Sequence, residues 1–131
     1  HPLRGVRKLG TKLYRNKFEA HAAKVLGDLC EYESKKIKYV THRNYIPDFI
    51  GKHKVNKKEI LVEAKGFFRV GDVQKYKAIR DSLEHTQELV FLLYNPRKPV
   101  RKGSKMNMGQ WCEKEGLKWF VLEDVVNAFT T

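Results

Sequence analysis

The stretch Glu59-Ile60-Leu61-Val62-Glu63-Ala64-Lys65-Gly66 decides the fold of this 131-residue chain. Its apolar and β-branched residues predict a strand, and the earlier segment Tyr45-Ile46-Pro47-Asp48-Phe49-Ile50 predicts another. A polar, lysine-rich turn separates the two, so we expect an antiparallel hairpin. Because side chains alternate along a strand, Glu63 and Lys65 share one face, and pairing would bring Asp48 into the same small volume.

Two carboxylates and an amine so placed are typical of a divalent-metal nuclease. Asp48 and Glu63 can hold Mg²⁺, a hard cation that prefers oxygen ligands. Mg²⁺ bound there would neutralise a phosphodiester and activate a water, while Lys65 orients that water or stabilises the developing charge. The same residues also occur on exposed strands, where they only pair with each other across the surface. Both interpretations stay open on these residues alone.

The composition indicates a nucleic-acid partner. The 27 Lys and Arg against 15 Asp and Glu leave a formal charge of +12, which suits salt-sensitive binding to phosphates. Ribosomal and chromatin proteins are equally basic, so charge does not separate an enzyme from a binder. No apolar stretch approaches the ~20 residues that span a bilayer, and the start lacks the apolar core of a signal peptide. We therefore expect a cytoplasmic protein with no membrane partner and no small-molecule cofactor.

Cys30 and Cys112 are the only cysteines, and each falls in an apparent helix among core-like residues. Buried free thiols are the favoured interpretation. The chain has no Cys-x-x-Cys, and its histidines lack the spacing of zinc ligands.

The N-terminal residues predict a basic arm at 1–15 followed by a single domain at 16–131. Asn16 is a candidate N-cap for a helix at 17–31, and Glu19 occupies the capping-box position three residues later. Glu19 could instead be a third carboxylate of the metal site, but the residues alone favour the cap. The arm's cations are Arg4, Arg7, Lys8, Lys12 and Arg15, and the helix's expected core stripe is Phe18, Ala22, Val25, Leu26 and Leu29.

Periodicity and turn residues predict the remaining elements. These are a strand at 32–40, a helix at 72–83 capped by Asp72, a buried strand at 89–94, a helix at 108–115 ended by Gly116, a strand at 117–121 and a helix at 123–129. The order of these elements predicts an α/β fold, with a mixed sheet whose antiparallel hairpin carries the carboxylates and helices on its faces.

The segment 95–105 is a cationic loop at the carboxyl end of a central strand, where α/β proteins bind ligands. A solvated surface loop is the alternative interpretation. Its cations are Arg97, Lys98, Arg101, Lys102 and Lys105.

Several stretches together resemble the phage endonuclease I family of Holliday-junction resolvases, within the PD-(D/E)xK, restriction-endonuclease-like fold. They occur in the family's order and cover residues 4 to 120. They are Gly5-Val6-Arg7-Lys8-Leu9-Gly10, the helix bearing Glu19, Pro47-Asp48-Phe49, Val62-Glu63-Ala64-Lys65-Gly66, Lys102-Gly103-Ser104, and Trp111-Cys112-Glu113-Lys114-Glu115-Gly116-Leu117-Lys118-Trp119.

The resemblance implies a metal-dependent enzyme that resolves four-way and other branched DNA by paired nicks, leaving 5′-phosphate and 3′-hydroxyl ends. Asp48, Glu63 and the Ala64 carbonyl would hold Mg²⁺ or Mn²⁺, with Lys65 assisting the attacking water. Glu19 would complete a two-metal site and would come from the opposite chain of an intertwined, domain-swapped homodimer. The cations of the arm and of the 95–105 loop would bind the junction arms, in the cytoplasm of an infected host cell.

Two alternatives remain. One is a nuclease of the same fold with another target, such as a restriction-type or transposon-end endonuclease. The other is a basic architectural protein that binds branched DNA without cutting it. The sequence shows no resemblance to a separate sequence-reading module, which favours recognition of DNA shape.

Overall fold

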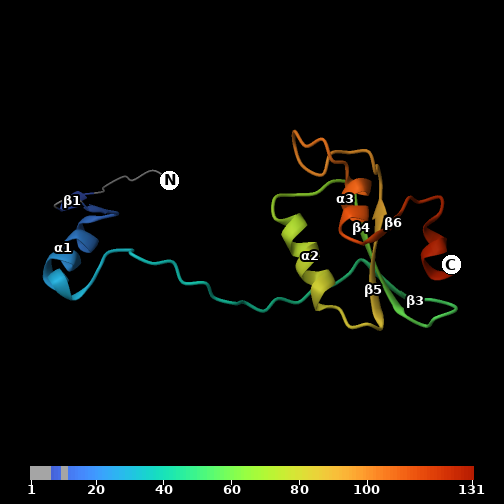
Figure 1. Ribbon diagram of the computed structural model, residues 1–131, viewed down its shortest axis with the longest axis horizontal. Helices are drawn as coiled ribbons and strands as arrows, with labels where there is room; N and C mark the ends of the chain where they lie inside the picture. Colours follow the sequence, from blue (N-terminus) through green and yellow to red (C-terminus); the bar gives the residue numbers. More distant parts are fainter. Residues whose placement is uncertain (1–6, 10–11) are drawn as a thin grey trace. The chain divides into compact units, whose positions relative to one another are not determined.

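The chain divides into two compact units, residues 1–42 and residues 43–131 (Figure 1). The computed structural model describes residues 7–9 and 12–131. The first unit therefore takes in the segment predicted as an arm together with the helix that follows it, and a single nuclease domain at 16–131 stays a prediction. Among the described helices, none has the length and apolar character needed to cross a membrane.

The first unit is a small hairpin followed by a helix. Strands β1 (Arg7–Leu9) and β2 (Lys12–Tyr14) pair antiparallel, and helix α1 (Lys17–Leu26) follows. Asn16 is its N-cap, as predicted, with the Asn16 side chain accepting a hydrogen bond from the Glu19 N–H at 2.8 Å. The predicted end at residue 31 is wrong, because Gly27 takes a positive φ of 53° and ends the α-helix. A 3₁₀ turn, η1 (Gly27–Leu29), follows.

The apolar stripe of this helix is uncovered. No residue of α1 is buried, and Phe18 and Val25 are 82% and 79% exposed. The prediction that the stripe faces a core is wrong within this unit. A segment of about 40 residues rarely covers its own apolar surface without help, and Tyr14 is the one buried residue over 14–42.

The predicted strand at 32–40 is also wrong. Residues 30–48 form neither helix nor strand, and Ile37, Tyr39 and Val40 are more than 80% exposed. A strand persists only where a neighbour pairs its backbone N–H and C=O groups, and no described strand pairs with this segment. Cys30 is exposed beyond the helix, so its predicted burial is wrong as well.

The second unit is built on a four-stranded mixed sheet with the order β3 (Phe49–Lys52), β4 (Glu59–Lys65), β5 (Gln87–Leu93), β6 (Lys118–Phe120). Strands β3 and β4 are antiparallel, whereas β4, β5 and β6 run parallel. This arrangement confirms the predicted mixed sheet and its hairpin. Strand β3 begins after Pro47, which has no N–H to donate to a ladder.

Helices cover both faces of this sheet (Figure 1). Helices α2 (Asp72–Ser82) and α3 (Met108–Lys114) pack on one face, where Leu61 and Phe91 point, and the 3₁₀ helix η2 (Val125–Phe129) packs on the other, against Ile60 and Val62. Glu63 and Lys65 share the face of Leu61 by strand alternation. The alternation therefore directs them toward α2.

The remaining boundaries are close to the predictions. Helix α3 ends just before Gly116, which takes a φ of 71° as expected for a helix stop. The predicted cap of α2 is wrong. Gly71, with a φ of 91°, occupies the N-cap position, and Asp72 is the first helical residue.

Cys112 provides a test of this core. Burial raises the pKa of its thiol to about 12, so it stays protonated and inaccessible near neutral pH. In a Cys30→Ser variant, we expect no reaction with a thiol-specific dye at pH 8 until guanidinium unfolds the protein. Rapid labelling of the native variant would show that the α3 core opens readily.

Candidate active site

Asp48 lies beside the end of β4 that carries Glu63. Phe49 pairs with Val62 across the hairpin, so the register places position 48 opposite Glu63. The Asp48 Oδ2 accepts a hydrogen bond from the Ala64 N–H at 2.9 Å. The Asp48 side chain is thus fixed to the backbone next to Glu63, on the exposed rim of the sheet.

The Glu63 carboxylate is buried, with the residue only 8% exposed. The Tyr45 hydroxyl donates to its Oε1 at 2.5 Å, and the Tyr76 hydroxyl donates to its Oε2 at 3.0 Å. Burial, reinforced by the negative charge of Glu63, raises the pKa of both tyrosines. Both hydroxyls therefore remain protonated and able to donate.

Lys65 lies between two acidic side chains. Its Nζ is 3.9 Å from the Glu63 Oε2 and 3.6 Å from the Asp72 Oδ2, and it lies 5.1 Å from the centre of the Tyr76 ring. Asp72 is 9% exposed, and its Oδ2 also accepts from the Arg69 N–H at 2.8 Å. The ammonium is therefore shared between Glu63 and a second, nearly buried carboxylate, and it lies slightly closer to that of Asp72.

Tyr45, Tyr76 and the ion pair between Asp72 and Lys65 were not among the site residues predicted above. Tyr76 has helical spacing to the apolar Val73 and Ile79 in the predicted helix at 72–83, and a buried tyrosine hydroxyl normally finds a hydrogen-bond partner. A tyrosine on the buried face of the helix, near a strand that carries a carboxylate, was therefore the sequence signal that could have predicted the hydrogen bond to Glu63. Tyr45 is only three residues before Asp48, which was a weaker signal.

Asp72→Asn is expected to slow cleavage about 10-fold, within the range for residues that support a site. The amide oxygen can still accept from the Arg69 N–H, but the charge that holds the Lys65 ammonium is gone. Single-turnover rates measure this change. Asp81→Asn is the matched control, because Asp81 lies in the last turn of the same helix and pairs with Arg80 instead. An unchanged rate in Asp72→Asn would show that Lys65 needs no such support.

The donors at this edge suit a hard divalent cation. Asp48, Glu63 and the Ala64 carbonyl offer oxygen atoms, which Mg²⁺ and Mn²⁺ prefer. Within residues 7–9 and 12–131, no three side chains of His, Cys, Asp or Glu cluster closely enough to hold a metal together. The edge thus supplies two carboxylates beside the Ala64 carbonyl.

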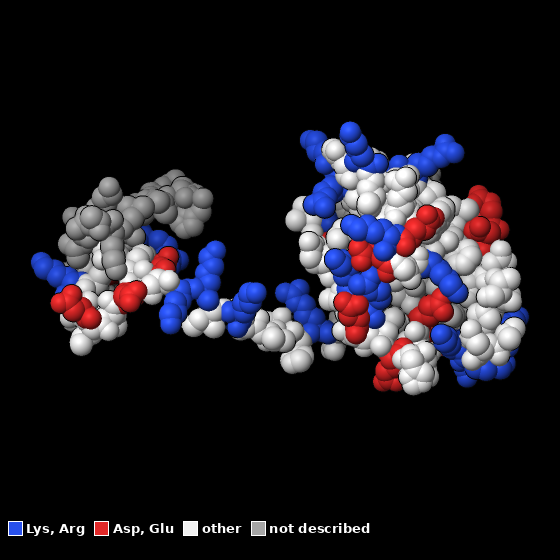
Figure 2. Space-filling model, viewed as in Figure 1, with Lys and Arg blue, Asp and Glu red and all other residues white. Residues whose placement is uncertain are grey.

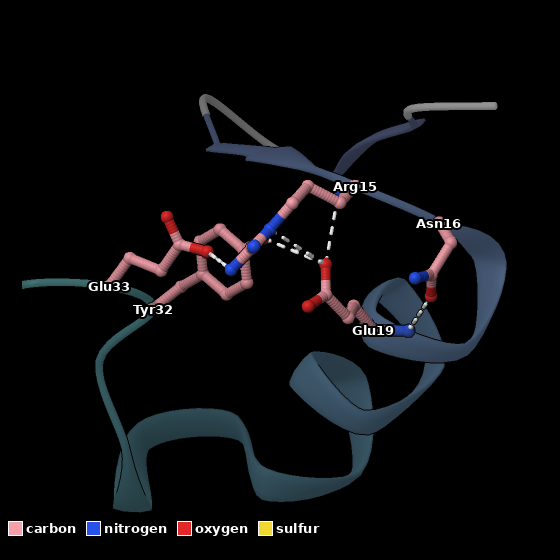
Figure 3. A network of polar contacts seen from close by, with 5 residues as sticks. All are labelled: Arg15, Asn16, Glu19, Tyr32 and Glu33. Carbon is pink, nitrogen blue, oxygen red and sulfur yellow. Dashed lines mark hydrogen bonds and ion pairs between the residues drawn. The ribbon is translucent and has the colours of Figure 1, made fainter. Parts of the chain in front are cut away.

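Glu19 belongs to a polar network of the first unit (Figure 3). Its Oε1 accepts from the Arg15 N–H and from the Tyr32 hydroxyl, both at 2.9 Å, and Arg15 also forms an ion pair with Glu33. The capping box that the position of Glu19 predicted is therefore incomplete. The Glu19 carboxylate accepts from the Arg15 N–H and lies 3.7 Å from the Arg15 guanidinium, and does not accept from the Asn16 N–H. A role of Glu19 beside Asp48 and Glu63 stays a prediction.

The 95–105 loop presents its cations at the same end of the sheet. Lys65 pairs with Leu93 in the parallel ladder, so the loop starts beside the carboxylates. Val100 is buried and its N–H donates to the Met106 carbonyl at 2.9 Å, which anchors the loop. Figure 2 shows Lys and Arg side chains gathered at this end of the second unit. The five cations named for this loop are exposed: Arg97, Lys98, Arg101, Lys102 and Lys105.

The predicted cations of the arm are only partly described. Arg4 lies outside the described residues, and Arg7, Lys8 and Lys12 belong to β1 and β2. Arg15 is half exposed and paired with Glu33.

A mixed sheet with two carboxylates and a lysine at one edge, beside a cationic loop, has the features of a nuclease. The family model for phage endonuclease I matches residues 4–125, and the chain belongs to that family. It is 32% identical over 123 residues to "Endonuclease I" of Escherichia phage T7, which covers 88% of this chain and 76% of that protein. It is 30% identical over 113 residues to "Endodeoxyribonuclease 1" of Enterobacteria phage T3, covering 81% and 70%. The protein is therefore an endonuclease of the phage endonuclease I family.

Proposed function

We propose that this endonuclease resolves four-way (Holliday) DNA junctions and other branched DNA by paired nicks that leave 5′-phosphate and 3′-hydroxyl ends. The relative from phage T3 is named as an endodeoxyribonuclease, which supports DNA as the substrate. A hydrolytic site is supported above all by the edge of β4. There the Asp48 carboxylate accepts a hydrogen bond from the Ala64 N–H and lies beside the buried Glu63. The enzyme would work in the cytoplasm of the infected host cell.

Asp48, Glu63 and the Ala64 carbonyl would hold Mg²⁺ or Mn²⁺, with Glu19 contributing to a second ion. Bound there, the cation would neutralise the scissile phosphate and lower the pKa of a water. Lys65 would orient that water or stabilise the leaving oxygen, because Asp72 and Glu63 hold its ammonium at the same edge. Asp48 is the more exposed of the two carboxylates and would lie closer to the substrate.

DNA binding would rest mainly on phosphate contacts. The exposed cations of the 95–105 loop adjoin the carboxylate edge, and the basic residues of the arm add to them. Such contacts fix a protein on DNA without reading its sequence. Selectivity would therefore come from the shape of the branch, with affinity falling steeply as salt rises.

An intertwined homodimer would account for the apolar surface of the first unit. Phe18, Val25 and Leu29 are 79–87% exposed, and the segment holding Ile37 and Tyr39 pairs with no described strand. Exposed apolar surface of this extent marks an interaction site. A second copy of the chain could cover the stripe, and the same exchange would bring Glu19 to the carboxylates of its partner.

A labelled four-way junction, incubated with and without Mg²⁺, tests this proposal. Symmetric nicks near the branch, with linear duplex left uncut, are expected. Cutting of linear DNA at a fixed sequence would instead indicate a restriction-type or transposon-end enzyme. Tight binding without cleavage in any metal would indicate an architectural protein.

A further inference from the structure

Glu63 is a buried carboxylate whose partners within the described chain are two neutral hydroxyls and a more distant ammonium. Tyr45 donates to Oε1 at 2.5 Å and Tyr76 donates to Oε2 at 3.0 Å, whereas the Lys65 Nζ is 3.9 Å from Oε2. A buried charge is costly unless it is hydrogen-bonded. The two hydroxyls meet that requirement without neutralising the charge.

The hydrogen bonds from the two tyrosines leave part of the Glu63 carboxylate able to bind a cation. An ionised carboxylate has about four lone-pair positions on its two oxygens. The tyrosines take one position on each oxygen, so each oxygen keeps another for a cation. The pair of hydroxyls also fixes the plane of the carboxylate, because it holds both ends at once.

The tyrosines come from two different elements and are themselves fixed. Tyr76 lies on α2 and is fully buried, with its ring packed against Phe68 and Phe91. Tyr45 comes from the segment that precedes β3, and its ring meets that of Tyr76 edge to face at 6.4 Å. Their hydroxyls therefore have little freedom to move away from Glu63.

We propose that Tyr45 and Tyr76 are positioning residues that orient Glu63 as a metal ligand and keep its charge available for the cation. Asp72 contributes by attracting the Lys65 ammonium, which would otherwise compete with the metal for Glu63. This inference rests on the proposed metal-dependent function. Neither tyrosine touches the substrate, and both act through Glu63.

Tyr45→Phe, Tyr76→Phe and the double variant test the inference, since each removes a hydroxyl and keeps the ring. Mn²⁺ is titrated into DNA-free protein by calorimetry, and single-turnover cleavage of a four-way junction is followed across a range of Mg²⁺ concentrations. We expect each single variant to bind Mn²⁺ about 10- to 100-fold more weakly, the range for partners of metal ligands. Cleavage should need correspondingly more Mg²⁺ and recover in part when Mg²⁺ is high, with junction affinity in EDTA unchanged.

Tyr94→Phe is the matched control, because Tyr94 follows β5 at the same edge and is 89% exposed. It should leave Mn²⁺ affinity unchanged. Unaltered Mn²⁺ affinity and Mg²⁺ dependence in the Tyr45 and Tyr76 variants would overturn the inference, and so would a lower melting temperature as the only change. If Tyr76→Phe does not fold, Tyr45→Phe decides, since its ring is only half-buried. A wild-type protein that neither binds Mn²⁺ nor cuts would instead overturn the proposed function.

Discussion

Glu63→Gln is expected to lower the rate of junction cleavage by about a thousand-fold or more, as for the loss of a group that acts directly in the chemical step. The amide keeps the shape of the side chain and one acceptor oxygen, but it removes the negative charge that would hold the metal. Asp48→Asn should act similarly. Junction affinity should change little, because in the proposed complex Lys and Arg contacts to phosphates would supply most of it.

Two measurements separate catalysis from folding in these variants. Cleavage is measured under single-turnover conditions with Mg²⁺, and binding is measured by gel shift in EDTA. Glu123→Gln is the control, because Glu123 is exposed and lies outside the candidate site. An equal loss of binding in Glu63→Gln would indicate that Glu63 is structural, and retained cleavage would remove it from the active site.

The hairpin that carries the site could be predicted because its signals are local. The run from Ile60 to Val62 is apolar on both faces, and the structure covers both faces of β4. The register then follows from the turn, which places Asp48 opposite Glu63. Strand β5 was equally clear, since a continuous apolar run is typical of a parallel strand buried on both sides.

The surroundings of the carboxylates were not predictable in the same way. The hydroxyl of Tyr76 reaches Glu63 only because α2 packs across β4. That packing is part of the tertiary structure and is not set by the local sequence. Asp72 had the sequence position of a helix cap, yet its carboxylate turns toward Lys65 and the Arg69 N–H. Local capping rules cannot anticipate a charged partner on a neighbouring strand.

The first unit departs most from its sequence pattern. An amphipathic stripe predicts a buried helix face, but Phe18 and Val25 stay exposed in the single chain. The β-branched and aromatic residues at 32–40 likewise predict a strand, but the structure has none there. Both patterns are typical of residues that pack against a neighbouring surface. In the proposed homodimer, that surface would come from a second copy of the chain.

Mixing two inactive variants tests that idea directly. If Glu19 acts beside Asp48 and Glu63 of the opposite subunit, a heterodimer of Glu19→Ala and Asp48→Asn has one site with both changes and one intact site. Purified through two different tags after joint refolding, it should regain about half of the wild-type nicking, as the symmetry of a two-fold dimer requires. Its products should be single nicks rather than resolved junctions.

The alternatives give different results in the same experiment. If Glu19 served its own chain's Asp48 and Glu63, each site of the heterodimer would carry one change and nicking would stay absent. If Glu19 only stabilises helix α1, the Glu19→Ala variant would cut normally, and only its melting temperature would be lower. Asn16→Ala is the companion variant, because it removes the side-chain cap of the same helix and leaves the carboxylate in place. It should cost about 1 kcal/mol of stability with nicking retained, so a stability loss alone cannot imitate the absence of Glu19 from the site.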